Sequence, residues 1–427
     1  MEDPKMTKEV DNENQQRTGC SPEQPDIPDG GFQAWLVILG CWCGMFCTFG
    51  LVNCIGVFEA YYVSATGPLH RYSQGEVSWI TSFQAWGIPF GGIMFGPIFD
   101  RYGPRWLLII GTLIYVFGLM MVSVSTQYYQ IFLSQGIVSA FGSSAIFNSC
   151  ISSVVSWFKH RRSYAFGVMV SGSSLGGVIM PIMMNELIPR VGFQWTMRII
   201  GFMILGLLAI TVCTVRPYLP PQPKPFRLQT YCSGLKEPAF AMTCTASFFF
   251  YWGLFIPFNY IVLQSEKAGI SPHIAQYMLP IINAVSIPGR IIPGFLADKA
   301  GRFNVAILVA GFTSIFCLAL WIPGQSQGAL IAFSVLYGFF SGSFISLAPT
   351  LVAQISDIRE IGSRQGTCFF FQSFGALTGS PIAGAISASQ NGSFLGLQLF
   401  CGFSLAASMA FYIFVRIKIA GFRLSRV

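Results

Sequence analysis

The sequence predicts an all-α membrane protein in which twelve transmembrane helices form two six-helix bundles. Three observations support this prediction. The chain has 427 residues, of which 53% are hydrophobic and only 10% are charged, whereas soluble proteins carry charge on about a quarter of their residues. Its charge-free stretches have the lengths of membrane-spanning helices, and the two halves of the chain resemble each other.

Charge-free stretches mark the predicted helices in order. A membrane-spanning helix needs about 20 apolar residues, and a helix pairs its backbone groups within its own segment. Three stretches exceed 50 residues, and each is divided into a hairpin at polar or turn residues, at 125–130, 323–328 and 387–393. The stretches are 30–58, 77–99, 106–158, 163–185, 199–215, 238–265, 274–297 (interrupted only by Arg290), 303–356 and 365–415.

A basic, proline-rich segment divides the chain into two halves. The predicted parts are a tail at 1–28, a bundle at 29–216, a linker at 217–237, a bundle at 238–416 and a tail at 417–427. An even number of spans places both tails on one side of the membrane. That side receives 20 of the 25 Lys and Arg residues, against three on the other side. Because basic residues concentrate in cytoplasmic loops, both termini are predicted to be cytoplasmic.

Composition excludes several classes of protein. The net charge of +8 comes from short basic clusters between apolar stretches, which does not indicate a nucleic-acid-binding patch. Most of the 12 Cys lie in apolar stretches, and no Cys or His spacing predicts a metal site. The sequence contains no recognisable catalytic triad or phosphate-binding loop, so it predicts neither an enzyme nor a cofactor. The expected partners are therefore a small-molecule substrate and the lipid bilayer, and no protein partner is indicated.

A short motif occurs once in each half. The pattern G-x-x-x-D-[RK]-x-G begins at Gly96 and again at Gly294, 198 residues later. Parallel repeats of this kind are typical of transporters built from two similar halves. Charged residues in such tight loops can latch helix ends in one conformation and release them in another, although a plain topogenic turn is the alternative. The gating residues predicted here are Asp100, Arg101, Asp298 and Lys299.

The repeated motif resembles that of the major facilitator superfamily, over residues 28–416. PDGGFQAW at 28–35 and SWFKHRRSYAFGVMVSGSSLGG at 156–177 are similar to motifs of the monocarboxylate porter family, and AQISDIREIGSRQG at 353–366 is similar to its fungal branch. The resemblance implies the major facilitator fold, secondary transport by alternating access, and the plasma membrane as the default location. Arg161 and Arg162, within the second motif, are added to the predicted gating residues. From the residues alone, Asp29 is expected to cap the first helix.

Arg290 is the most informative residue within a predicted span. It lies eight residues before Asp298, about 12 Å along a helix, and so near the middle of a ~30 Å hydrocarbon core. A cation there is costly and normally functional, and its planar fork suits a carboxylate. Asn283 and Ser286 share its helical face. The resemblance implies an arginine of the eighth helix that binds the substrate carboxylate, and a structural hydrogen bond is the alternative.

The chain departs from the family pattern at two positions. Animal members carry an aspartate where Ser286 stands and a lysine where Asn53 stands, and both are implicated in proton coupling. None of the 17 Asp and Glu lies near the middle of a predicted span. Proton coupling therefore stays open, with a weak-acid substrate that carries its own proton, or a uniporter, as alternatives. Further pocket residues are predicted at Asn53, Gln84 and Asn148.

Aromatic clusters at 247–260, 337–344 and 368–374 predict a pocket more apolar than lactate requires. The expected function is transport of a small organic acid or a carboxylate-bearing metabolite. The alternative is efflux of an uncharged or larger fungal secondary metabolite. A non-transporting nutrient sensor is a remote third choice, because the predicted tails are short. Nothing in the sequence sets the direction of transport.

Overall fold

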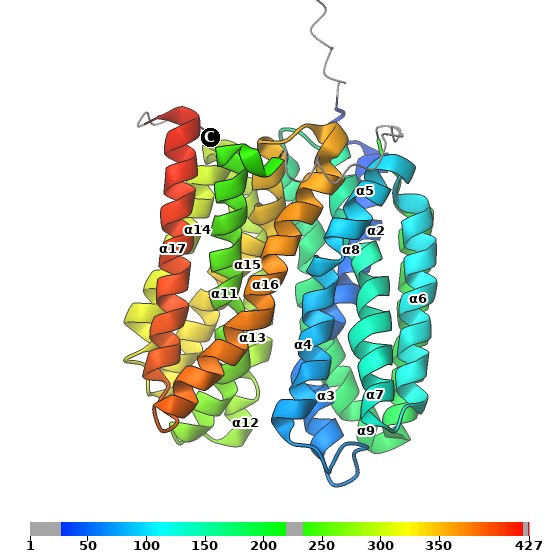
Figure 1. Ribbon diagram of the computed structural model, residues 1–427, viewed down its shortest axis with the longest axis vertical. Coiled ribbons are helices and arrows are strands. Elements are labelled where there is room, and N and C mark those ends of the chain that lie inside the picture. The colour runs from blue at the N-terminus through cyan, green and yellow to red at the C-terminus, as the bar shows by residue number, and fades with distance from the viewer. Residues whose placement is uncertain (1–26, 219–233, 422–425, 427) are drawn as a thin grey trace, which may run out of the picture.

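The computed structural model describes residues 27–218, 234–421 and 426, and these residues form helices and no strands. The two groups of helices lie side by side (Figure 1), with α2 to α9 in one bundle and α11 to α17 in the other. Each bundle has its own hydrophobic core, with Tyr115 and Phe166 in the first, and Trp321 and Phe333 in the second. Most of the predicted first tail and most of the predicted linker lie outside the described residues.

The N-terminal bundle contains six spans, two of which are joined end to end. The helix α9 holds the fifth and sixth spans, because Gly192 interrupts it with a φ of 80°. The elements are α2 (Phe32–Val52), α3 (Ile55–Val63), α4 (Gln74–Phe90), α5 (Gly92–Tyr102), α6 (Pro104–Val124), α7 (Tyr128–Ile131), the π-helical η1 (Phe132–Ser139), α8 (Ala140–Trp157) and α9 (Arg162–Thr214).

The C-terminal bundle contains the other six spans. Its elements are α11 (Pro238–Lys267), the short α12 (Pro272–Ala275), α13 (Met278–Ala300), α14 (Arg302–Phe316), the π-helical η2 (Cys317–Trp321), α15 (Gln327–Gln354), the 3₁₀ turn η3 (Ile358–Glu360), α16 (Ile361–Ser389) and α17 (Leu395–Ala420). The helix α17 continues four residues past the predicted end of the bundle at 416. Basic side chains such as Lys418 can extend along an apolar helix and still reach water.

The predicted fold class is confirmed. Nine helices in the described part of the chain are long and apolar enough to cross a membrane. One of them, α9, contains two spans, and α4–α5 and α16 supply the remaining two. The described residues therefore contain the twelve spans that the charge-free stretches predict.

Two of the spans in the first bundle are broken near their middle. Between α4 and α5 the break follows Pro89, which removes a backbone donor from the helix. Between α2 and α3 the helix breaks at Asn53 and Cys54, where the Asn53 amide donates to the carbonyl of Phe49 at 2.9 Å. Asn53 thus lies at the break, and its side chain lines a cavity together with residues of both bundles.

The two bundles pack most closely near one end. We call this end, at the top of Figure 1, the terminal face, because Asp29 and Ala420 lie there; the opposite end is the far face. Near the terminal face α5 and α16 meet backbone to backbone, and a β-carbon at Gly96 would overlap the carbonyl oxygen of Gly362. Toward the far face α16 leans away from α4 (Figure 1). The bundles are therefore joined most tightly at the terminal face.

Candidate functional site

A pocket lies between the two bundles, at the centre of the molecule. Helices α2, α8 and α9 line it from one side, and α11, α13, α15 and α16 line it from the other. Its aromatic residues are Phe49, Phe147, Tyr251, Phe255, Phe258 and Phe369. Its polar residues are Asn53, Ser173, Asn283 and Arg290. An apolar cavity with a few convergent polar groups is the usual form of a small-molecule site.

Arg290 is the charged residue of this pocket, and only 5% of its surface is exposed. One guanidinium nitrogen, Nη1, donates to the carbonyl oxygen of Val170 at 2.6 Å and to the hydroxyl of Ser173, both on α9. Its Nε has no hydrogen-bond partner, and no acidic side chain among the described residues forms an ion pair with it. A buried cation bonded only to neutral groups is costly and is a strong site for an anion.

Three of the predicted pocket residues come together here, and Ser286 does not join them. Arg290, Asn283 and Asn53 line the same cavity. Ser286 lies on the same helix but packs against α9, where its hydroxyl is 2.7 Å from the hydroxyl of Ser174. Because Ser286 donates its own proton to the carbonyl of Asn283, Ser174 must donate to Ser286. The pair holds the two bundles together beside the pocket.

Gln84 and Asn148 lie within the N-terminal bundle, outside the set of pocket-lining residues. The Oε1 of Gln84 accepts a hydrogen bond from Gln135 at 3.0 Å, and Gln135 accepts one from the hydroxyl of Tyr62 at 2.6 Å. The amide of Asn148 donates to the carbonyl of Ser144 at 2.9 Å. Gln84 is thus bonded to a neighbouring helix, and Asn148 is bonded within its own helix, α8.

The aromatic walls follow two of the three predicted clusters. The stretch 247–260 supplies Tyr251, Phe255 and Phe258, and the stretch 368–374 supplies Phe369. The stretch 337–344 supplies none of the lining residues; its Phe344 instead stacks on Phe250, with ring centroids 3.5 Å apart. The sequence reasoning missed Phe147 and Ser173, although Ser173 lies within the motif at 156–177.

Asp100 joins the bundles at the terminal face through the start of α16. Its carboxylate accepts hydrogen bonds from the backbone N–H of Gly362 at 2.9 Å and of Ser363 at 2.8 Å, and from the Ser363 hydroxyl at 2.7 Å. These N–H groups belong to the first turn of the helix, where they have no partner within the helix and favour a negative charge. We call this contact the first latch.

Asp298 forms the second latch in the reverse direction. Its carboxylate accepts from the backbone N–H of Ser163 at 3.0 Å and of Tyr164 at 2.9 Å, at the start of α9. Arg302 bonds Asp298 at 3.1 Å and also donates to the carbonyl of Lys159 at 2.8 Å. Each motif aspartate thus binds the first turn of a helix in the opposite bundle.

The predicted basic gating residues differ in their positions. Arg162 is buried and crosses between the bundles, because its Nη1 donates to the carbonyl of Ala353 on α15 at 3.1 Å. Arg161 is exposed on the terminal face. Arg101 and Lys299 are also exposed there, over the rings of Tyr102 and Phe295. The aspartates therefore make the contacts of the latches, without their neighbouring basic residues.

The expectation that Asp29 caps the first helix is wrong. The residue before α2 is Gly31, which makes no side-chain cap. Asp29 adopts a positive φ of 50° and turns its carboxylate toward the loop before α9. There it accepts from the backbone N–H of Lys159 at 2.6 Å and of His160 at 2.7 Å. A contact between residues 130 apart stabilises this loop, and local sequence does not reveal it.

The first latch is expected to respond to pH. Asp100 lies just beyond the apolar stretch, and its burial raises its pKa to about 6, against the lowering effect of the hydrogen bonds from Ser363 and Gly362. In water an aspartate has a pKa near 3.9. Because proton uptake favours the state with the higher pKa, the latched state should gain population as pH falls from about 7 to about 5. Spin labels at Arg101 and Arg359 should then approach each other.

The control for this prediction is Asp100→Asn, which cannot titrate and should hold the label distance constant over the same pH range. A distance that increases as pH falls in the unmodified chain would contradict the prediction.

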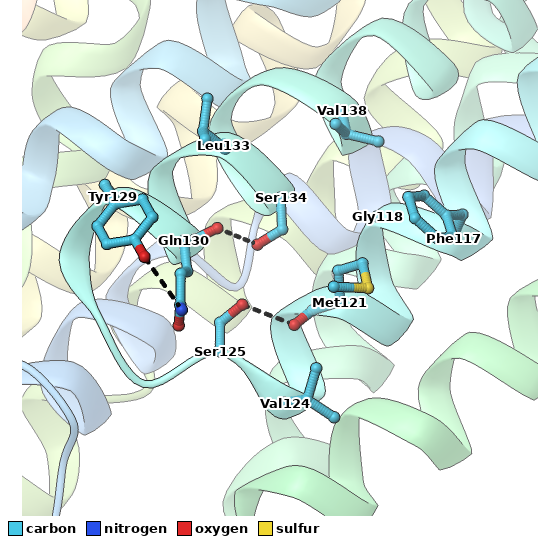
Figure 2. A pocket seen from close by; sticks show the side chains of 10 residues that line it. All are labelled: Phe117, Gly118, Met121, Val124, Ser125, Tyr129, Gln130, Leu133, Ser134 and Val138. Carbon is cyan, nitrogen blue, oxygen red and sulfur yellow. Dashed lines mark hydrogen bonds between the residues drawn. The ribbon is translucent and has the colours of Figure 1, made fainter.

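A second pocket lies on the outside of the N-terminal bundle, between α6 and η1 (Figure 2). Its serines are bonded to its own walls, since Ser134 donates to the carbonyl of Gln130 and Ser125 to that of Met121, each at 2.7 Å. Its lining residues include no charged side chain. It therefore offers less to an ionic substrate than the central pocket does.

Comparison with known proteins agrees with this architecture. Residues 41–238 and 241–421 match the model of the Major Facilitator Superfamily. MFS-type transporter 1 of Ophiocordyceps sp. is 46% identical over 395 residues, which cover 92% of this chain and 88% of that protein. The Fujikurins efflux protein of Gibberella fujikuroi is 42% identical over 88% of this chain and 80% of that protein.

Solved structures show the same fold at low identity. The human organic anion transporter MFSD10 has a TM-score of 0.71 at 14% identity, covering 90% of this chain and all of that chain. The E. coli fucose:proton symporter FucP has a TM-score of 0.70 at 13% identity, covering 88% and 98%. Members of this family are transporters and not enzymes. The chain therefore belongs to the Major Facilitator Superfamily and is a multi-pass membrane transporter.

Proposed function

We propose that the chain exports an acidic, largely apolar secondary metabolite by alternating access. The observation that carries the proposal is Arg290, a buried cation without an acidic partner among the described residues, in a pocket with aromatic walls. An anion would supply the missing charge, and the rings would bury an apolar body. Similar proteins named as the Fujikurins efflux protein and the Aspyridones efflux protein apdF support export rather than uptake.

The substrate is proposed to be larger than lactate. A small monocarboxylate would engage Arg290 but leave rings such as Phe255 and Phe258 facing water. On the motifs at 28–35 and 156–177 we propose that the chain belongs to the monocarboxylate porter family, and on the segment 353–366 that it belongs to the fungal branch. Within that branch we propose that its substrate is an acid bulkier than lactate, because Ser286 and Asn53 stand where the family has an aspartate and a lysine.

The terminal face is proposed to be cytoplasmic, in the plasma membrane, on the strength of the bias of Lys and Arg. Both latches are formed, so the pocket would be closed toward the cytoplasm and would face outward. In alternating access this is the state that follows release of an exported substrate.

Any proton coupling is proposed to depend on the substrate itself. The acidic group of the substrate would be the titratable group that carries the proton through the pocket.

Transport by the purified chain in proteoliposomes tests the proposal. The labelled panel comprises lactate, pyruvate, aromatic carboxylic acids of increasing size, and the methyl ester of each aromatic acid, with and without a pH gradient. The quantity compared is the flux above that of protein-free liposomes, because uncharged esters also cross lipid unaided. We expect this flux to be fastest for the aromatic acids and slowest for their esters. If lactate and pyruvate prove the best substrates, the chain is a small-monocarboxylate porter. If the esters move as fast as the acids, Arg290 does not bind an anion.

A further inference from the structure

Two amide side chains from opposite bundles meet at one end of the central pocket. Asn53 lies at the break between α2 and α3, and Asn283 lies on α13, two turns before Arg290. A β-carbon built at Gly177 of α9 would lie 2.9 Å from Cγ of Asn53 and 3.1 Å from Cγ of Asn283. The two amides therefore lie beside each other, and both line the pocket.

The orientation of each amide follows from its hydrogen bond. Asn53 donates to the carbonyl of Phe49 at 2.9 Å, and Asn283 donates to the carbonyl of Leu279 at 3.3 Å. Because a carbonyl can only accept, the amino group of each amide must face its own helix. The two Oδ1 atoms then face away from those helices, and neither is among the fully buried polar atoms that lack a partner. This end of the pocket thus offers two amide oxygens as acceptors, beside the second N–H of each amino group.

The other end of the pocket offers donors. Arg290 follows Asn283 by seven residues on the same helix, a rise of about 10 Å. Most of the remaining lining residues are apolar or aromatic, and they include Leu254 and Phe255 on α11. The cavity therefore has a cation and two amide oxygens about 10 Å apart along α13, in a largely apolar lining.

A packing role for the amides is a weaker explanation. The hydroxyls of Ser174 and Ser286 lie at the same contact between α9 and α13, and they satisfy each other at 2.7 Å. Asn53 and Asn283 come from opposite bundles and lie close enough to pair, yet the structure gives no hydrogen bond between them. If the two amides were needed only for packing, an N–H of one would be expected to bond the oxygen of the other, as these hydroxyls bond each other.

We propose that Asn53 and Asn283 form a subsite for a hydrogen-bond donor, so that the substrate is a bipolar acid. It carries an acidic group at Arg290 and a hydroxyl or N–H group about 10 Å away, on an apolar and aromatic body. This inference rests on the proposed function, since it takes Arg290 as the anchor of the acid. It adds the second recognition group, which selects among acids of similar size.

A pair of isosteric probes isolates the donor. 4-(4-Hydroxyphenyl)butanoate carries a carboxylate and a phenol, and 4-(4-methylphenyl)butanoate replaces the hydroxyl by a methyl group. Binding of each is measured by calorimetry on the purified full chain, in wild type, Asn53→Leu, Asn283→Leu and the smaller Asn283→Ala. Gln194→Leu, which alters an exposed amide on α9, is the matched control. Thermal unfolding verifies that each variant is folded.

The measured quantity is the ratio of the two affinities. We expect each substitution of Asn53 or Asn283 to lower the preference for the hydroxyl probe about tenfold, through loss of the phenol's acceptor. Gln194→Leu should leave the ratio unchanged. Equal ratios in wild type and in all the Asn variants overturn the subsite.

A failure of the proposed function would give a different result, which Arg290→Gln reveals. Arg290→Gln should weaken both probes by the same factor, because both carry the carboxylate. If both probes bind wild type and Arg290→Gln equally well, or if neither binds wild type at all, the anchor itself is wrong and the subsite falls with it. If Arg290→Gln weakens both probes and the Asn variants preserve the ratio, the proposed function stands and only the subsite is lost.

Discussion

Arg290→Gln is expected to weaken transport of acidic substrates by about 10- to 100-fold, the value of a hydrogen bond to a charged group. The same substitution should raise the temperature of unfolding in the absence of substrate. The buried guanidinium bonds only the carbonyl of Val170 and the hydroxyl of Ser173, and removing a buried charge that lacks an ionic partner relieves a desolvation penalty. Transport in proteoliposomes and thermal unfolding of the purified chain measure the two effects.

The matched control removes a different arginine from within a span. Arg198 is partly exposed on α9, where it lies over the ring of Trp195 and contacts the hydroxyl of Ser123. Arg198→Gln should transport like wild type. Arg290→Lys, which keeps the charge and loses the planar fork, should fall between wild type and Arg290→Gln. Normal transport by Arg290→Gln would make the arginine structural.

Gly96→Ala is expected to abolish most transport without unfolding the protein. Alanine is preferred to glycine within a helix by about 1 kcal/mol, so α5 itself should gain stability. The new methyl group, however, would overlap the carbonyl of Gly362 and force α5 and α16 apart. Overpacking of this kind costs about 1–3 kcal/mol, enough to shift the equilibrium away from the latched state by about 5- to 150-fold. The distance between spin labels at Arg101 and Arg359 should lengthen as the transport rate falls.

Gly206 offers the control for this prediction, because a β-carbon there would meet nothing within 4 Å. Gly206→Ala should therefore leave both transport and label distance unchanged. Gly366→Ala, at the same contact between the bundles, should reproduce the effect of Gly96→Ala. If Gly96→Ala transports at the wild-type rate, close contact at this position is not required for the transport cycle.

The spans could be predicted from the sequence because lipid imposes a simple rule on side chains. Lengths of charge-free chain and the turn residues at 125–130 or 387–393 were enough to count twelve helices. The break at Asn53 and Cys54 could not be predicted in the same way, because it lies inside a charge-free stretch and its two residues are neither proline nor glycine. Asp29 was misassigned for a related reason: an acid before an apolar stretch is a common helix cap, and only the folded chain brings residues 159–161 to it.

The candidate site was predictable where a single residue carries a large energetic penalty. Arg290 could be singled out because a cation in the middle of a span is energetically costly and is normally retained for a function. Gln84 and Asn148 had no such signal, because an amide within a span can bond a neighbouring helix or its own helix as readily as a substrate, and helical spacing does not separate these outcomes. The partners of Asp100 were also hidden, because 262 residues separate it from Gly362.

The reciprocal latches carry an implication for the origin of this chain. Asp100 binds the N–H of Ser363, and Asp298 binds the N–H of Ser163; the two serines are 200 residues apart, close to the 198 that separate the aspartates. In a symmetric dimer, a residue at one position of each subunit binds a residue at another position of its partner. The same contact therefore occurs twice. An ancestral protein of half this length would satisfy the same geometry by pairing with its own copy. Once two such copies were fused into one chain, each contact would be free to change alone. The present asymmetry, in which Arg302 reinforces one latch and the Ser363 hydroxyl the other, is what such independent drift would leave.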